Sequence, residues 1–144
     1  MNPPTRDKLR ELIQHKLKRD IIEPSTSPSS STILLVPKPT GGVRFVIDYR
    51  ALNKAVAPDA YTLPAVDESL ASLNGNRYFT SLDMKEAFWT VPLNERSREL
   101  TAFRTPDGIF MYKRLPIGLK TASAVFCRFI DRVLGDLKWD SVLA

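Results

Sequence analysis

A single carboxylate, Asp83, follows an apolar stretch and is the residue whose position best suits chemistry. Alternating side chains place Phe79 and Asp83 on one face, so the pattern predicts a strand over 77–83. A carboxylate at the carboxyl end of a strand, facing away from helices, can hold Mg²⁺, which prefers oxygen ligands and keeps substrate phosphates in its shell. The alternative is that Asp83 caps the turn that follows. Spacing alone favours capping.

A second candidate is a group of cations near a predicted hairpin. Lys38, Arg44, Arg50 and Lys54 lie on or beside two β-rich runs, and the planar guanidinium of Arg44 suits phosphate oxygens. Ordinary surface charge explains the same residues, and both interpretations stay open at this point.

The net charge of +5 lies in the first part of the chain. Residues 1–54 hold ten Lys and Arg against five Asp and Glu, whereas residues 55–144 hold eleven of each. This asymmetry favours a phosphate-rich partner, with a solvated basic face as the alternative.

Composition restricts the class of protein. A chain of 144 residues with 43% hydrophobic content can form one domain with a core. The amino-terminal stretch lacks the apolar core of a secretory signal, and the apolar runs are too short for a bilayer, so we expect an intracellular protein (cytoplasmic or nuclear) that is neither secreted nor bound to a membrane. One cysteine, Cys127, excludes an internal disulfide. No P-loop, GxSxG, HExxH or CxxC motif occurs.

Apolar periodicity and turn residues predict an α+β domain. The expected elements, in chain order, are a helix over 5–20, a Ser/Pro loop over 23–32, a hairpin of 33–38 and 43–48, a short helix over 64–73, strands over 77–83 and 88–93, a hairpin of 101–105 and 109–114, a helix over 121–137 and a strand from residue 139.

Three spaced blocks carry a resemblance to a known family: VRFVIDYRALNK (43–54), YFTSLDMKEAFWTVPL (78–93) and YKRLPIGLKTASAVF (112–126). Together with DIIEPSTSPSSSTILLVPKPTGG upstream, they resemble the reverse transcriptases of gypsy-type LTR retrotransposons and retroviruses. The resemblance covers roughly residues 17 to 144 in the order and spacing of the family. It implies a right-hand polymerase fold, with an antiparallel sheet and packed helices, divided into fingers over 1–76 and a partial palm with an inserted fingers segment over 77–144.

The resemblance also implies roles for individual residues, and it favours the metal-ligand interpretation of Asp83. Asp83 matches the first catalytic aspartate, and the backbone carbonyl of Met84 joins it as a ligand of Mg²⁺ or Mn²⁺ in the complete enzyme. Phe88 matches the aromatic gate that excludes a ribose 2′-hydroxyl. Nucleotide-binding positions are Lys38, Arg44, Glu86, Ala87, Phe88 and Ile117. Template-binding positions are Asp48, Arg50, Asn53 and Gly118.

The chain departs from the family pattern after residue 115. The family usually has Phe or Gln at 117, Asn at 121 and Pro at 123, where this chain has Ile117, Thr121 and Ser123. Cys127 stands where Gln is common. Losing the proline should loosen the entry to the long helix, and Ile117 offers only apolar contact to a sugar. These departures weaken the expectation of an efficient enzyme, not of the ancestry.

Two of the three catalytic carboxylates are not in this chain. The family places them in a Tyr-x-Asp-Asp hairpin after an apolar strand that WDSVLA would begin, so the hairpin would follow Ala144. We therefore expect a fragment of an RNA-directed DNA polymerase that does not polymerise alone. Partners of the complete enzyme would be an RNA or DNA template-primer, a deoxynucleoside triphosphate and the remaining palm, thumb and RNase H segments. The alternatives are a nucleic-acid-binding module and an inert relic of a retroelement polyprotein.

Overall fold

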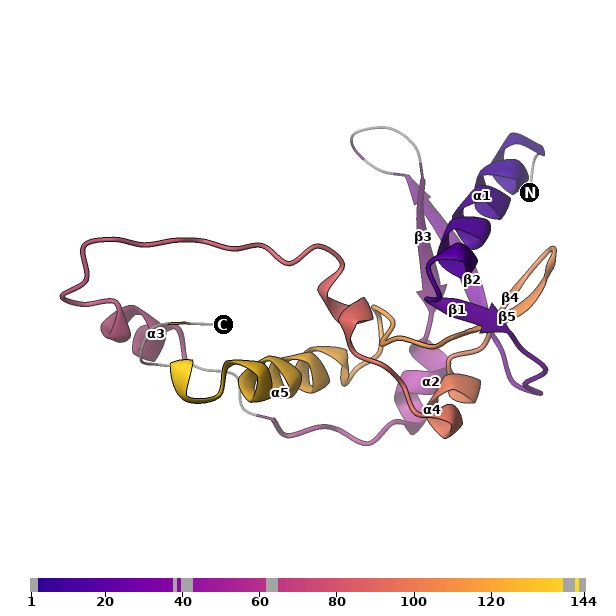
Figure 1. Ribbon diagram of the computed structural model, residues 1–144. Helices are drawn as coiled ribbons and strands as arrows, with labels where there is room; N and C mark the ends of the chain where they lie inside the picture. Colours follow the sequence, from indigo (N-terminus) through magenta and orange to yellow (C-terminus); the bar gives the residue numbers. More distant parts are fainter. Residues whose placement is uncertain (1–2, 38, 40–42, 62–64, 139–141, 143–144) are drawn as a thin grey trace.

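The computed structural model describes residues 3–37, 39, 43–61, 65–138 and 142, and its centre is a five-stranded sheet (Figure 1). The strands are β1 (Ile22–Pro24), β2 (Ser31–Pro37), β3 (Val43–Asp48), β4 (Phe103–Thr105) and β5 (Gly108–Tyr112). Their order in the sheet is β1-β5-β4-β2-β3. Both predicted hairpins form, with β2 antiparallel to β3 and β4 antiparallel to β5. The α+β fold is confirmed, and the sheet is antiparallel as expected except at one pairing, where β2 runs parallel to β4.

Helix α1 (Pro3–Lys18) lies along one face of the sheet (Figure 1). Leu9 and Ile13 recur one turn apart and are buried, as expected of an amphipathic helix. They pack with buried side chains of β1, β3, β4 and β5. The buried members of this main core are Leu9, Ile13, Ile21, Ile22, Ile47, Tyr49, Phe103 and Tyr112.

A second, smaller core joins the long helix α5 (Ala122–Leu134) to the turn before it and to η1, the 3-10 helix Ala87–Thr90. Its buried residues are Val91, Leu115 and Ala122, with Phe88 and Phe126 packed against them. Helix α5 and the short helix α3 (Val66–Ser72) lie away from the sheet, and the segment between α3 and η1 crosses the space beside them as an extended trace (Figure 1).

Two short helices were not expected: α2 (Arg50–Ala55) and α4 (Glu95–Leu100). The helix predicted over 121–137 forms as α5 followed by the 3-10 helix η2 (Gly135–Leu137). The predicted strand over 88–93 is wrong, because residues 87–90 form η1 and only Pro92 makes an isolated bridge, to Arg114. The strand expected from residue 139 lies outside the described residues except for Val142, which makes a bridge to Lys138.

The predicted strand over 77–83 is also wrong. These residues have no regular secondary structure and no described segment pairs with them. A strand needs a neighbour that takes up its backbone hydrogen bonds, and sequence alternation alone does not supply one. Tyr78 and Leu82 are consequently 95% and 89% exposed.

No helix within the described ranges has the length and apolar character needed to cross a membrane.

Candidate active site

The turn from Glu86 to Thr90 holds three of the expected nucleotide-binding residues, Glu86, Ala87 and Phe88. Glu86 has a φ of 55°, in the left-handed region, and its carbonyl accepts a 2.9 Å hydrogen bond from the Trp89 amide. The Phe88 ring is half-buried against Phe126 of α5, with centroids 5.2 Å apart. The fold thus fixes the expected gate residue through a ring contact with the long helix.

An ion pair holds this turn from the side of α1. The Glu86 carboxylate pairs with the Arg19 guanidinium, which follows the end of α1. The Arg19 hydrogen bond lowers the pKa of Glu86, and nearby Lys85 and Lys16 add to this effect. The carboxylate therefore serves to anchor the turn and stays ionised.

Asp83 and Met84 lie just before this turn and are exposed. Within the described ranges, Asp83 has no hydrogen-bond or ion-pair partner, so the structure gives no support to the capping alternative. No cluster of three His, Cys, Asp or Glu side chains occurs in the same part of the chain. One carboxylate does not make the octahedral oxygen set that Mg²⁺ requires, so the described residues do not form a complete metal site.

Asn53 joins two of the blocks that contain expected template-binding residues. Its Nδ2 donates to the Gly118 carbonyl at 2.8 Å, and its Oδ1 accepts from the Lys120 amide at 2.8 Å. Gly118 has a φ of 102°, and a Cβ there would lie 3.6 Å from the Tyr49 ring. The Asn53 side chain therefore clamps the loop before α5 to helix α2.

Asp48 and Arg50 form the other half of the expected template group. The Arg50 guanidinium donates to both carboxylate oxygens of Asp48, at 2.9 and 2.7 Å, and the Arg50 amide donates at 3.1 Å. This side-chain hydrogen bonding, with the backbone bond, lowers the pKa of Asp48 to about 2. These two charges pair with each other, whereas Lys54, which lines the same pocket, makes no ion pair with any described residue.

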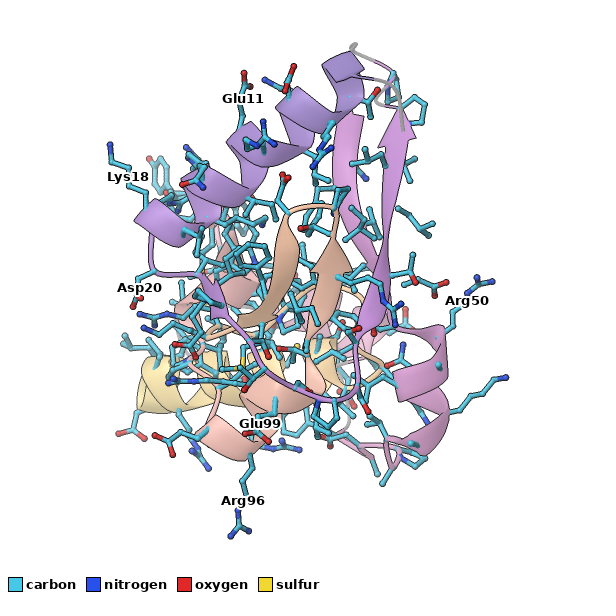
Figure 2. The ribbon with its side chains drawn as sticks, turned by 90° about the vertical axis from the view of Figure 1, so that its right-hand side faces the viewer. Glu11, Lys18, Asp20, Arg50, Arg96 and Glu99 are labelled. Atoms are coloured by element: carbon cyan, nitrogen blue, oxygen red, sulfur yellow. The ribbon has the colours of Figure 1, made fainter. Side chains whose placement is uncertain are left out.

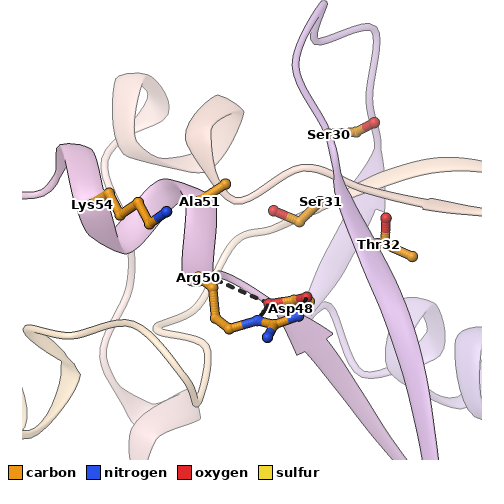
Figure 3. Close-up of a pocket in the computed structure, with 7 residues that line it drawn as sticks. All are labelled: Ser30, Ser31, Thr32, Asp48, Arg50, Ala51 and Lys54. Atoms are coloured by element: carbon orange, nitrogen blue, oxygen red, sulfur yellow. Dashed lines mark hydrogen bonds and ion pairs between the residues drawn. The ribbon is translucent and has the colours of Figure 1, made fainter.

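Asp48 and Arg50 line an open pocket at the end of the sheet (Figure 3). Its other lining residues are Ser30, Ser31, Thr32, Ala51 and Lys54. Sequence reasoning missed the three hydroxyl residues, which read as part of a mobile Ser/Pro loop. The register places Thr32 opposite Asp48, and extending the predicted hairpin by one pair would have found it. The pocket offers hydroxyl groups, the Lys54 ammonium and the remaining N–H groups of Arg50, which are donors suited to phosphate or sugar oxygens, beside the Asp48 carboxylate.

The remaining expected site residues are less constrained. Arg44 is exposed on β3, opposite Val36, and its side chain makes no ion pair with any described residue. Ile117 is 65% exposed in the loop before Gly118. Lys38 lies outside the described residues. The structure thus pairs Asp48 with Arg50 and Asn53 with Gly118, and it places Glu86, Ala87 and Phe88 in one turn. Arg44 makes no hydrogen bond or ion pair with any of these described residues.

Two buried residues with a bearing on the site were not found from the sequence. The Tyr49 hydroxyl donates to the Thr101 carbonyl at 2.8 Å, and burial raises the pKa of Tyr49. Lys16 is 7% exposed on the sheet side of α1. The helical repeat places Lys16 on the same face as Leu9, Ile13 and Leu17, which could have predicted its burial. A lysine is usually assigned to the surface, so this position was missed.

The fold and these joined blocks define a class of protein, the reverse transcriptases. The prototype foamy virus protease-reverse transcriptase superposes with a TM-score of 0.81 and 29% identity over 96% of this chain, which is 19% of that chain. The foamy viral protease-reverse transcriptase in complex with an RNA/DNA hybrid superposes with a TM-score of 0.83 at 28% identity, covering 95% of this chain and 18% of that chain.

The sequence comparisons agree. A family model described as "Reverse transcriptase (RNA-dependent DNA polymerase)" matches residues 36–142, and the chain belongs to this family. The Transposon Tf2-3 polyprotein of Schizosaccharomyces pombe is 37% identical over 135 residues, covering 94% of this chain. The Tf2-7 polyprotein of the same organism is 36% identical over the same length. The chain spans about 10% of the length of these curated relatives, so it corresponds to a fragment of a reverse transcriptase domain within them.

Proposed function

We propose that this chain supplies the fingers (1–76) and the beginning of the palm (77–144) of an RNA-directed DNA polymerase. Such an enzyme extends a primer 3′-hydroxyl with a deoxynucleoside triphosphate along an RNA or DNA template and releases pyrophosphate. The observation that carries the proposal is the Asn53 clamp on Gly118 and Lys120, because it joins two distant blocks that the family resemblance assigns to the template.

The roles follow the resemblance, residue by residue. Asp83, with the Met84 carbonyl, would be the first ligand of Mg²⁺ or Mn²⁺ in the complete enzyme, where the ions stabilise the charge of the transferring phosphoryl group. The amides of Glu86 and Ala87 would face the triphosphate, and Phe88 would exclude a 2′-hydroxyl. Lys38 and Arg44 would hold the outer phosphates, with Ile117 beside the nucleotide. The template would lie along Asp48, Arg50, Asn53 and Gly118. We place this activity inside the cell, in cytoplasm or nucleus.

The chain alone should not polymerise. Two-metal phosphoryl transfer needs ions about 3.5–4 Å apart, held by carboxylates from more than one strand. Asp83 is the one acid that the family pattern places there in this chain. The check is primer extension by the purified protein on an RNA template with Mg²⁺ and then Mn²⁺, for which we expect no incorporation. Incorporation that disappears in Asp83→Asn would contradict this expectation.

Binding of an RNA/DNA hybrid tests the template part of the proposal. We expect fluorescence anisotropy to detect binding that weakens steeply with salt, because phosphate contacts release counterions. Arg50→Ala should weaken binding by roughly three- to tenfold, the scale of one lost charge-assisted phosphate contact. The matched control is Arg96→Ala, because the Arg96 side chain on α4 points away from the molecule (Figure 2). Salt-insensitive binding, or equal losses in both variants, would count against the proposal.

A second candidate function is nucleic-acid binding without any polymerase role. The concentration of the +5 charge in residues 1–54 favours it. A generic basic surface should bind duplex DNA, hybrid and heparin with similar affinity, whereas a template site should prefer the hybrid. No binding at low salt would leave the third alternative, an inert relic.

A further inference from the structure

Lys16 is a charged side chain buried inside a group of aromatic rings. Its Nζ lies 3.7 Å from the centroid of the Trp89 ring, 5.5 Å from that of Tyr112 and 5.7 Å from that of Phe45. These rings belong to η1, β5 and β3, so one ammonium connects α1 to three elements. A cation over an indole face is attracted by the ring quadrupole, and the attraction grows when water is excluded.

The same helix end holds the turn at a second point. The Glu86 carboxylate pairs with Arg19, one turn beyond Lys16, and the Arg19 guanidinium lies 5.7 Å from the Trp89 centroid. Glu86 is a non-glycine residue with a φ of 55°, a conformation that persists where its surroundings fix it. Lys16 of α1 and Arg19, which follows that helix, thus hold the Glu86–Thr90 turn at Trp89 and at Glu86.

We propose that Lys16 and Arg19 form a positioning brace that sets the place of the Glu86–Thr90 turn against the sheet. The functional meaning of this brace rests on the proposed function, because the turn contains Phe88 and begins three residues after Asp83. Lys16 is a positioning residue: it touches Trp89 and reaches the proposed site through that ring. The ring of Phe88, fixed on its other side by Phe126, depends on the same turn.

Stability and positioning should respond to Lys16 in opposite ways. Burial lowers the pKa of Lys16 to about 8, with Glu86 opposing and Arg19 adding to the effect. A buried ammonium costs folding free energy, and an apolar side chain of similar length removes that cost. The substitution Lys16→Met should therefore keep or raise the stability of the fold. If Lys16 positions the Glu86–Thr90 turn, the same substitution should loosen that turn.

Hydrogen exchange, read by mass spectrometry on the peptide covering 84–92, tests the brace without nucleotide or metal. The reporters are the Trp89 amide, bonded to the Glu86 carbonyl at 2.9 Å, and the Val91 amide, bonded to the Phe88 carbonyl at 3.2 Å. We expect Lys16→Met to speed their exchange about tenfold, the scale of one desolvated cation–π contact, at unchanged or higher global stability. Lys18→Met is the control, because Lys18 points to solvent from the same helix (Figure 2). Lys16→Arg should restore slow exchange.

A pH profile gives an independent readout. In a Trp139→Phe background, the fluorescence of Trp89 should change with a midpoint near the Lys16 pKa of about 8, and Lys16→Met should abolish that transition. The other titratable groups around the site are Glu86, Arg19, Lys85, Arg114 and Tyr112. Burial raises the pKa of Tyr112, so that Tyr112 does not titrate in the measured window of pH 6.5–9.5.

The outcomes separate the brace from the proposed function. Unchanged exchange in Lys16→Met, or equal acceleration in Lys18→Met, would overturn the brace whatever the hybrid-binding result. Accelerated exchange with restored protection in Lys16→Arg would support it even if hybrid binding failed, in which case the brace would hold a turn that serves another purpose.

Discussion

At the residue scale, the structure fixes the side chains that connect separate sequence blocks more firmly than it fixes the candidate catalytic carboxylate. Asp83 is exposed and unpartnered within the described residues, whereas Asn53 uses both ends of its amide to hold the loop before α5. A catalytic carboxylate needs a rigid frame. In this chain that frame includes the amide of Asn53, inside a family block, and the buried charge of Lys16, outside the blocks.

Asn53→Ala should destabilise the fold by ~1–2 kcal/mol, because two hydrogen bonds of modest net value are lost. Urea unfolding checks this, and hybrid binding should weaken in parallel. The control is Asn74→Ala, an exposed asparagine whose side chain makes no hydrogen bond among the described residues. Equal stability of the two variants would contradict the clamp.

Lys16 should give stability a pH dependence of known sign. Its pKa is lowered from 10.5 to about 8, so between these values the unfolded chain binds more protons than the folded one. The contribution of Lys16 to the free energy of unfolding therefore rises with pH through that window, by ~3 kcal/mol at most. Below that window the contribution does not change with pH. Urea unfolding at pH 7.5, 8.5 and 9.5 checks the slope. The Lys16→Met variant should lack this rise. If the free energy of unfolding of the wild type minus that of Lys16→Met fell with rising pH, the lowered pKa of Lys16 would be refuted.

At the element scale, strand β4 is the centre of the main core. Phe103 is fully buried, and its ring centroid lies 5.5 Å from those of Phe45 and Tyr112. The strand is three residues long, yet it pairs with β2 on one side and β5 on the other.

Phe103→Ala should cost ~3–5 kcal/mol, the usual loss for removing a buried aromatic ring. Phe79→Ala, which changes a ring that is 63% exposed, should alter stability by under ~0.5 kcal/mol. Thermal and urea unfolding of the two variants makes the comparison. Similar losses in both would mean that the 77–83 segment is packed in solution.

Elements with both a local signal and a local partner were predictable from the sequence. The two hairpins have turn residues between β-rich runs, and α1 and α5 carry strong helical periods. The 77–83 stretch has the same alternation but no neighbour, and 87–90 contains apolar residues that suit a strand or a tight helical turn equally. For the site, the motif blocks predicted Asp48, Arg50, Asn53 and Gly118 as template-binding positions. The hydrogen bonds among these residues depend on tertiary packing, which the spacing of motifs along the chain does not specify.

At the scale of the whole molecule, the segment before the Glu86 turn exposes a cluster of apolar side chains. Tyr78, Phe79, Leu82 and Met84 are between 47% and 95% exposed. A cluster of this kind marks an interaction site or an aggregation liability. The chain spans about 10% of the length of its polyprotein relatives.

The double variant Tyr78→Ser/Leu82→Ser should therefore reduce self-association and dye binding without lowering stability. Light scattering at increasing concentration and binding of a hydrophobic dye are the measurements. Leu100→Ser, a change at an isolated leucine of α4 that is 60% exposed, is the control. Loss of stability in the double variant would show that this segment packs in solution.

The strand order has a consequence for synthesis on the ribosome. Ser31 of β2 pairs with Phe103 of β4, and Ile22 of β1 pairs with Tyr112 of β5, so both edges of the sheet come from early residues and its middle from late ones. The β2–β3 hairpin and α1 must wait with their apolar faces uncovered until Tyr112 has left the exit tunnel. Closure then depends on long-range contacts, which form slowly. Translation pauses before Tyr112 would lengthen that exposed interval, and a nascent chain held there would be a substrate for chaperones.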